Sequence, residues 1–201
     1  MVIPEDNYIT YSLLAIISAV SLYGIYNKRV FQAMILHPAS VIHKKEYYRI
    51  LSSALVHNSI LHLGLNLFML YIFCSGLEES ASGLGRLSLM LIIGSSLLVG
   101  HLLSLIIYRR NITYSCAGAS GIVIGCMFSY MILHPFKNHL SFPLIGTIPN
   151  IYATAGYLAL TLFYSRKFNK GKIDYGVHIG GAVGGSLITI LLQPEVIMNL
   201  L

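Results

Sequence analysis

The sequence predicts an all-α, polytopic membrane protein with six transmembrane helices in one bundle. Only 10% of its 201 residues are charged, against about 25% in a typical soluble domain, and the mean hydropathy is +0.73. Six stretches approach the roughly 20 apolar residues that cross a bilayer, without Asp, Glu, Lys or Arg inside them. Because lipid offers no partners for backbone polar groups, such uninterrupted runs favour helices. No linker divides the chain, so we expect a single domain over residues 1–201.

We expect the membrane helices at 9–26, 60–77, 87–108, 116–133, 148–164 and 177–192. The connections between them are short except for residues 27–59, which combine basic residues with two apolar pieces. This segment is too apolar to extend freely into water. We therefore expect it to form short helices that lie at the membrane interface beside the bundle.

The formal net charge of +6 does not indicate nucleic-acid binding. The basic residues lie in the connections between apolar runs, where Lys and Arg normally mark membrane topology. The three cysteines, Cys74, Cys116 and Cys126, lie in or beside the apolar runs without the spacing of metal ligands, so we interpret them as packing residues. We therefore expect membrane lipid as a partner and no nucleic acid.

Polar side chains inside the predicted membrane helices are the candidates for a site, because their burial in lipid costs free energy unless they find partners. They are His62, Asn66, His101, Ser120 and His178. His62 and Asn66 are four residues apart and share one face of the second helix. The second, fourth and sixth helices run in the same direction, and Ser120 and His178 lie near the starts of the last two. We expect His62, Asn66, Ser120 and His178 to meet at one depth.

Paired glycines predict that the fourth and sixth helices touch. A G-x-x-x-G follows the serine and another follows the histidine, and such motifs let helix backbones approach closely. We assign helix packing to Gly118, Gly121, Gly125, Gly181 and Gly185. The contact would bring the Ser120 hydroxyl within hydrogen-bond reach of the His178 imidazole. This is the geometry of nucleophilic catalysis, in which the imidazole takes the serine proton during attack on a carbonyl.

His62 and Asn66 offer N–H donors for the oxyanion that such an attack creates. Asp174 stands four residues before His178 but near the helix start, so we interpret it as a helix cap rather than the third member of a relay. Packing alone is the other interpretation of Ser120. A structural bond between the second helix and the first connection is the other interpretation of His62 and Asn66.

At these residues the sequence resembles the rhomboid family of intramembrane serine proteases. The resemblance rests on four motifs in order along the chain, E-x-x-R at 46–49, H-x-x-x-N at 62–66, G-x-S-G at 118–121 and H-x-G-G at 178–181 with a further glycine at 185. Glu78 is similar to the acidic residue that closes the second helix of the family. The resemblance implies a minimal six-helix bundle whose first loop lies in the membrane, with Ser120 as the nucleophile and His178 as the general base.

By this resemblance the chain is an intramembrane serine endopeptidase that cleaves transmembrane protein substrates through a Ser120–His178 dyad, without a cofactor or a metal. Two positions depart from the family. Ile124 stands in place of the aromatic residue that often stacks on the base histidine in the family, so we expect another side chain to support His178. Ser53 stands where some bacterial members have a histidine, and we expect little consequence from it.

Several other residues receive structural interpretations: His57 at a helix entrance, His101 in an interhelical hydrogen bond, and Glu46, Arg49 and Glu78 in ion pairing or capping. A metalloprotease is disfavoured because no H-E-x-x-H occurs. One rival function is a noncatalytic rhomboid-like protein that binds or escorts membrane clients. Another is a small transporter, which should show inverted repeats and broken helices.

Two criteria for membrane orientation disagree. We expect a multi-pass protein of a bacterial inner membrane, and the resemblance implies a cytoplasmic N-terminus with an active site that opens to the opposite side. However, the N-terminal segment and the connections on its side carry only Arg86 and Lys137 of the thirteen Lys and Arg residues. The positive-inside rule therefore predicts the inverse orientation.

Overall fold

The computed structural model describes residues 7–80, 85–142, 146–168 and 174–200, and most of these residues are helical. The long helices are α1 (Tyr8–Tyr26), α5 (Ile60–Ser80), α6 (Gly85–Tyr108), α7 (Ser120–Leu133), α8 (Asn150–Phe168) and α9 (Tyr175–Leu192). The shorter elements are α2 (Lys28–Met34), α3 (Pro38–Lys44), α4 (Arg49–Ser52), a 3₁₀ turn (Ser53–Leu55), β1 (Asn138–Phe142), β2 (Gly146–Pro149) and a second 3₁₀ turn (Pro194–Leu200).

In the part of the chain that the structure describes, four helices are long and apolar enough to cross a membrane, namely α1, α5, α6 and α9. Helix α7 is apolar but has only 14 residues. It corresponds to the predicted helix 116–133, and the prediction was wrong at its start, because Cys116 exchanges main-chain hydrogen bonds of 2.9 and 3.0 Å with Leu36. Gly118, with φ at +126°, also departs from helical geometry, so the helix begins only at Ser120.

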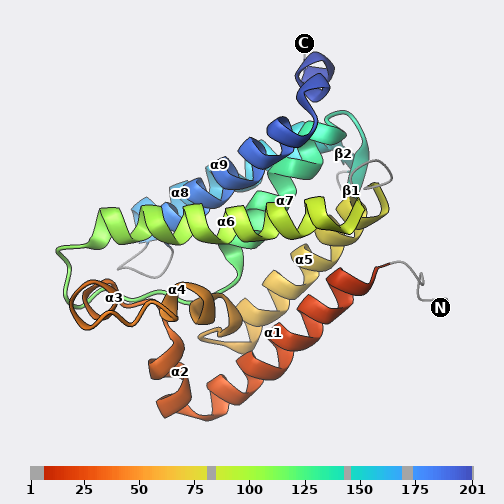
Figure 1. Ribbon diagram of the computed structural model, residues 1–201. Coiled ribbons are helices and arrows are strands. Elements are labelled where there is room, and N and C mark those ends of the chain that lie inside the picture. The colour runs from red at the N-terminus through yellow and green to blue at the C-terminus, as the bar shows by residue number, and fades with distance from the viewer. Residues whose placement is uncertain (1–6, 81–84, 143–145, 169–173, 201) are drawn as a thin grey trace.

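Helix α7 lies at the centre of the bundle, and most of its residues are buried. It packs against α5, α6, α8 and α9, while α1 lies on the outer side of α5 (Figure 1). Side chains from α5, α6 and α7 form the core, and among the largest that are fully buried are Leu70, Phe73, Leu89, Met127 and Tyr130. The central position of α7 places its first residue, Ser120, inside the protein rather than on its outer surface.

The first connection forms short helices beside the ends of α1 and α6 (Figure 1). Arg49 holds this segment together. Its Nη1 donates to the carbonyl oxygens of Gln32 and Ile35, both at 2.9 Å, and its Nε donates to Glu46 Oε2 at 2.5 Å. The interpretation of Glu46 and Arg49 as a structural pair is confirmed.

Glu78 near the end of α5 caps the start of α1. Its two carboxylate oxygens accept hydrogen bonds from the main-chain N–H groups of Ile9 and Thr10, both at 2.9 Å, and from the Thr10 hydroxyl at 2.7 Å. A carboxylate is favourable there because the first N–H groups of a helix lack partners and carry partial positive charge. The expected capping role of Glu78 is confirmed.

An antiparallel hairpin of β1 and β2 follows α7, and the sequence analysis did not predict it. The backbone of residues 146–149 belongs to β2, so α8 begins at Asn150 and not at the predicted residue 148.

Candidate active site

Ser120 and His178 meet at the starts of their helices. Ser120 is the first residue of α7, and His178 is the fourth residue of α9. The Ser120 hydroxyl donates to Nε2 of His178 at 2.9 Å. With Nε2 as the acceptor, a neutral imidazole carries its proton on Nδ1, and this buried atom has no hydrogen-bond partner among the described residues. The pair therefore has the arrangement of a nucleophile and its base, without a third side chain bonded to the imidazole.

Two glycine contacts hold α7 and α9 at this short separation. A Cβ atom on Gly181 would lie 2.2 Å from the Gly121 carbonyl oxygen, and one on Gly185 would lie 2.4 Å from the Gly125 carbonyl oxygen. Both distances are far below van der Waals contact. The structure thus brings these four glycines together as helix-packing positions, and any side chain at Gly181 or Gly185 would force the two helices apart.

Helix α9 makes a second close contact with α6, which the sequence analysis missed. A Cβ on Gly180 would lie 2.6 Å from the Gly100 Cα atom, and one on Gly184 would lie 2.6 Å from the Ser95 carbonyl oxygen. The signal in the sequence is the doubling of each glycine, at 180–181 and 184–185. In each doublet one glycine faces α6 and the other faces α7, so α9 is fixed from two sides.

Asp174 is the cap of α9, as the sequence analysis expected. Its Oδ1 accepts a hydrogen bond from the Val177 N–H at 3.0 Å, and the Ser104 hydroxyl of α6 donates to Oδ2. The carboxylate thereby fixes the first turn of α9 and ties it to α6. Because His178 is in this turn, Asp174 positions the imidazole through the backbone.

The structure also brings His62 and Asn66 to the Ser120–His178 pair. All four residues line one cavity of about 210 Å³. His62 is the third residue of α5, and its Nδ1–H donates to Asn58 Oδ1 at 3.1 Å. One N–H of the Asn66 amide donates to the His62 carbonyl oxygen at 2.9 Å, and the amide has a second N–H to offer.

Gly118 differs from the other glycines that we assigned to helix packing. It precedes α7 and has a φ of +126°, a conformation that favours glycine. A Cβ at this position would lie 2.7 Å from Cε1 of His62. The assignment to helix packing was wrong for this residue, and the physical reason for the glycine is backbone conformation together with close approach to the His62 ring.

His57 fixes the segment that precedes Ser120. Its Nε2 accepts a hydrogen bond from the Ala119 N–H at 3.2 Å, so its proton is on Nδ1, which donates to the Ser21 hydroxyl at 2.7 Å. That hydroxyl donates to the Leu55 carbonyl oxygen at 2.7 Å. Burial, reinforced by the neighbouring His62, lowers the pKa of His57 to about 3, which keeps the ring neutral. The structural interpretation of His57 is confirmed.

Ser53 and His101 complete the attachment of this segment. The Ser53 carbonyl oxygen accepts from the Gly118 N–H at 2.9 Å, and its hydroxyl donates to Nε2 of His101 at 2.9 Å. Nδ1–H of His101 donates to the Leu97 carbonyl oxygen at 2.8 Å. His101 thus bonds from α6 to the 3₁₀ turn of the first connection, whereas we expected packing or a hydrogen bond to another membrane helix. Ser53 contributes more than the sequence analysis allowed.

The main-chain N–H groups at the start of α7 are functional candidates that the sequence analysis missed. The first bond within this helix runs from the Val123 N–H to the Ala119 carbonyl oxygen. The earlier N–H groups, beginning with that of Ser120, therefore lie at the positive end of a helix beside the serine hydroxyl. The position of Ser120 at the beginning of an apolar run was the available signal.

Among the residues that the structure describes, no three His, Cys, Asp or Glu side chains are grouped so that they could hold a metal ion. The polar side chains that line the cavity are His62, Asn66, His101, Cys116, Ser120, Tyr157, Asp174 and His178. Together the fold and this cavity define a helical, multi-pass membrane protein with a serine–histidine pair among its helices. A family model described as the Rhomboid domain matches residues 44–195, and the chain belongs to the rhomboid family.

Three curated relatives are each similar over 146 residues. "Putative rhomboid protease YdcA" of Bacillus subtilis is 24% identical, over 73% of this chain and 67% of the relative. "Rhomboid protein 1, mitochondrial" of Saccharomyces cerevisiae is 32% identical, over 69% of this chain and 40% of the relative. "Rhomboid protease GluP" of Bacillus subtilis is 28% identical, over 73% of this chain and 26% of the relative. The similarity therefore covers less than two thirds of the length of the last two proteins.

Proposed function

We propose that the protein is an intramembrane serine endopeptidase that cleaves transmembrane protein substrates. The observation that carries this proposal is the 2.9 Å hydrogen bond between Ser120 and His178 in a cavity that His62 and Asn66 also line. Membership of the rhomboid family and two relatives named as rhomboid proteases support it.

In the proposed reaction, Ser120 Oγ attacks the carbonyl carbon of the scissile peptide bond while Nε2 of His178 takes the hydroxyl proton. The resulting oxyanion accepts hydrogen bonds from the Ser120 main-chain N–H, the second N–H of Asn66 and a ring N–H of His62. His178 returns the proton to the leaving amine, and an acyl-enzyme on Ser120 remains. His178 then takes a proton from a water molecule, whose oxygen attacks the acyl carbon. The bond from this carbon to Ser120 Oγ breaks, His178 returns the proton to Oγ, and the new carboxyl end is released. No step requires a cofactor.

The length of α7 supports a site below the membrane surface. Fourteen helical residues extend over about 21 Å, which is less than the roughly 30 Å of hydrocarbon in a bilayer. We place Ser120 at this depth in a bundle of six crossings formed by α1 and α5–α9 within a single domain over residues 1–201. The cavity around Ser120 gives water a place at the reacting bond.

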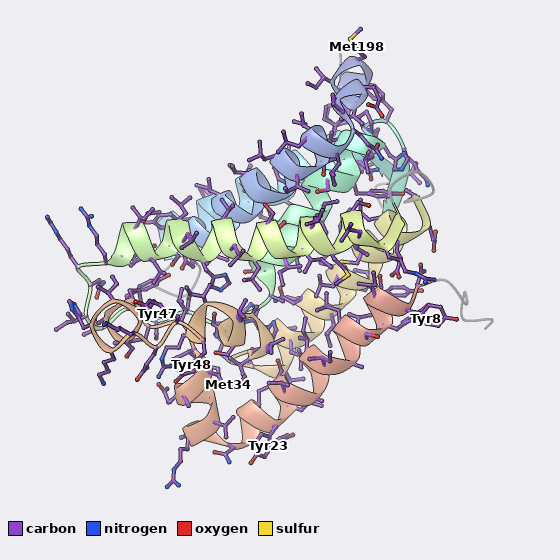
Figure 2. All side chains as sticks on the ribbon, viewed as in Figure 1. Tyr8, Tyr23, Met34, Tyr47, Tyr48 and Met198 are labelled. Atoms are coloured by element: carbon purple, nitrogen blue, oxygen red, sulfur yellow. The ribbon has the colours of Figure 1, made fainter. Side chains whose placement is uncertain are left out.

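We also propose that the first connection lies in the plane of the membrane. Its outer side carries exposed apolar and aromatic side chains beside basic ones, with exposed fractions of 45% for Ile42, 60% for Tyr47, 52% for Tyr48 and 58% for Leu51. Figure 2 shows Tyr47 and Tyr48 on this part of the molecule. Side chains of this kind partition to the boundary between lipid headgroups and acyl chains. Membrane lipid is therefore a direct partner.

Substrates of such a site are membrane helices that unwind easily near the cut, because an intact helix shields its peptide bonds. We place the protein in a bacterial inner membrane, in line with the bacterial source of two of the relatives. The described basic and aromatic side chains form part of the membrane boundary in this proposal and not a nucleic-acid site.

The test is cleavage of a model transmembrane substrate by the purified protein in liposomes. We expect Ser120→Ala and His178→Ala each to lower the rate by about 10³-fold or more. Labelling with a fluorophosphonate probe, lost in Ser120→Ala, should accompany cleavage by the wild type. Full activity in either variant would overturn the mechanism. Absence of both cleavage and labelling in the wild type would favour a noncatalytic protein that binds or escorts membrane clients.

A further inference from the structure

The two edges of the His62 ring have different surroundings. On one edge, Nδ1 lies 3.1 Å from Oδ1 of Asn58. On the other edge, Nε2 and Cε1 face the backbone of Gly118, since a Cβ at Gly118 would lie 3.0 Å from Nε2 and 2.7 Å from Cε1. Gly118 and His62 both line the cavity that holds Ser120. The group that bonds Nδ1 therefore controls the proton on the nitrogen that faces the site.

This control follows from the chemistry of imidazole and amide groups. A neutral imidazole carries one proton, so if Nδ1–H donates to an oxygen, Nε2 holds a lone pair and cannot bind an oxyanion. A carboxamide can also turn by about 180° and present its NH₂ group in place of its oxygen, with little change in shape. An amide N–H directed at Nδ1 makes Nδ1 the acceptor and places the proton on Nε2.

We propose that Asn58 is a positioning residue for His62, and this inference rests on the proposed peptidase function. Asn58 orients the His62 ring through Nδ1. When its amide turns to present an N–H to Nδ1, the Nδ1 proton passes to water in the cavity and water returns a proton to Nε2, so that Nε2–H points to the oxyanion. One side chain thereby matches both proton arrangements of His62. It accepts from Nδ1–H when the site is empty and donates to Nδ1 when the site holds negative charge.

The backbone of His62 is held independently of Asn58. The His62 N–H donates to the Ser59 hydroxyl at 3.2 Å, and the Leu63 N–H donates to the Ser59 carbonyl oxygen at 3.0 Å. The ring itself also meets His57 edge to face, with ring centroids 4.9 Å apart. Asn58 is exposed, so replacing it leaves the core unchanged. Loss of its amide should therefore change the ring of His62 and not the start of α5.

The kinetic test uses Asn58→Leu, which has a similar volume and no hydrogen-bonding group. We expect kcat for a model transmembrane substrate in liposomes to fall about tenfold with KM within twofold, because a donor is misdirected rather than removed. In a His62→Ala background the same substitution should have no further effect, since Asn58 acts through His62. Asn111→Leu is the control, because Asn111 is also exposed and its side chain, in the described contacts, bonds only to nearby Thr113.

A second measurement reads the proton directly. In protein with ¹⁵N-labelled histidine rings, the fluorophosphonate adduct of Ser120 carries a phosphonyl oxygen that stands in for the oxyanion. We expect the His62 signal, assigned by its loss in His62→Ala, to show a proton on Nε2 in the wild type and a mixture of both neutral forms in Asn58→Leu. Thermal unfolding in detergent should be unchanged by Asn58→Leu.

The inference fails if Asn58→Leu keeps the wild-type kcat. It also fails if Asn58→Leu lowers kcat further in the His62→Ala background, or if Nε2 of His62 carries no proton in the wild-type adduct. The outcome for the proposed function is separate, because it depends on Ser120→Ala. If Ser120→Ala is inactive but His62→Ala cleaves at the wild-type rate, the proposed peptidase mechanism stands and the role of Asn58 is excluded. An active Ser120→Ala removes both.

Discussion

Helices α9 and α1 both cross the predicted membrane, but they are held in different ways. In the apolar part of α9, 50% of the residues are buried inside the protein, against 22% for α1. Helix α9 meets its neighbours backbone to backbone through Gly180, Gly181, Gly184 and Gly185. Helix α1 exposes most of its surface, including Tyr8 and Tyr23, which are 58% and 61% exposed (Figure 2).

The side-chain hydrogen bonds that join α1 to other elements lie near its two ends, whereas Ile17 in its middle packs in the apolar core. Glu78 caps its first turn, and Ser21 near its last turns joins Leu55 and His57. Through His57, α1 supports the Ala119 N–H and hence the segment before Ser120. Thus α9 carries a reacting group and is fixed by steric contact. Helix α1 has no reacting group and supports the segment before Ser120 through the hydrogen bonds of Ser21 and His57. The site therefore depends on steric fit at α9 and on hydrogen bonds at α1.

Among changes outside the reacting pair, the largest effect is expected from Gly181→Val. A Cβ at Gly181 would lie 2.2 Å from the Gly121 carbonyl oxygen, so α7 and α9 must separate and the hydrogen bond between Ser120 and His178 must break. A displacement of about 1 Å at a reacting pair costs on the order of a hundredfold in rate, so we expect cleavage in liposomes to fall at least that much. Gly94→Val on α6 is the control, because a Cβ there meets nothing within 4 Å. If Gly181→Val cleaved at the wild-type rate, the close glycine contact of α9 would not be needed to hold His178 at Ser120.

An intermediate effect is expected from pH on the α1 side. The pKa of His57 is about 3 in the folded protein, against 6.5 for an unperturbed histidine, because of burial and then of its neighbour His62. The unfolded chain therefore binds one more proton below pH 6.5, and the free energy of unfolding should fall by about 2 kcal/mol between pH 7.5 and pH 5 from this residue.

The measurement is unfolding in detergent at both pH values, with His57→Gln as the comparison. The variant lacks the titrating ring, so its stability should change with pH by about 2 kcal/mol less than that of the wild type. Equal pH dependence in the two proteins would show that His57 is not held neutral and that α1 supports the site in some other way.

The smallest effect is expected from Glu78→Gln. The glutamine keeps one acceptor oxygen but loses the charge and one of the two oxygens that cap α1, which should cost about 1 kcal/mol of stability. Cleavage should stay within about twofold of the wild type, because α1 holds no reacting group. Glu195→Gln, in the exposed 3₁₀ turn after α9, should change neither property. If Glu78→Gln lost as much cleavage as Gly181→Val, the site would depend on α1 as strongly as on α9.

Much of the candidate site could be predicted from the sequence because its polar residues interrupt apolar membrane helices. Ser120, His178, His62 and Asn66 are polar residues in apolar runs, and their helices run in the same direction, so a common depth follows from counting crossings. The bond between Ser120 and His178 follows from glycine spacing, because glycines at i and i+4 share one face of a helix.

The errors have a common physical cause. Residues 116–119 carry no charged side chain, so they join the apolar run of the helix that follows, and their non-helical form depends on main-chain bonds to Leu36 and Ser53, which are distant in sequence. The hairpin of β1 and β2 likewise depends on pairing between strands. Apolar composition cannot distinguish a helix from an extended segment that finds partners elsewhere in the fold.

The membrane class, the approximate helices and the candidate site residues follow from the order of residues alone, because hydropathy and helical periodicity are local properties of a chain. The start of α7, the glycines that face α6 and the hydrogen-bond partners of the histidines at the site depend on the tertiary structure. These features depend on partners such as Leu36, Gly100, Ser21 and Asn58, which come close only when the chain folds. Hydrogen bonds and steric contacts act over a few ångströms in space, whatever the separation along the chain.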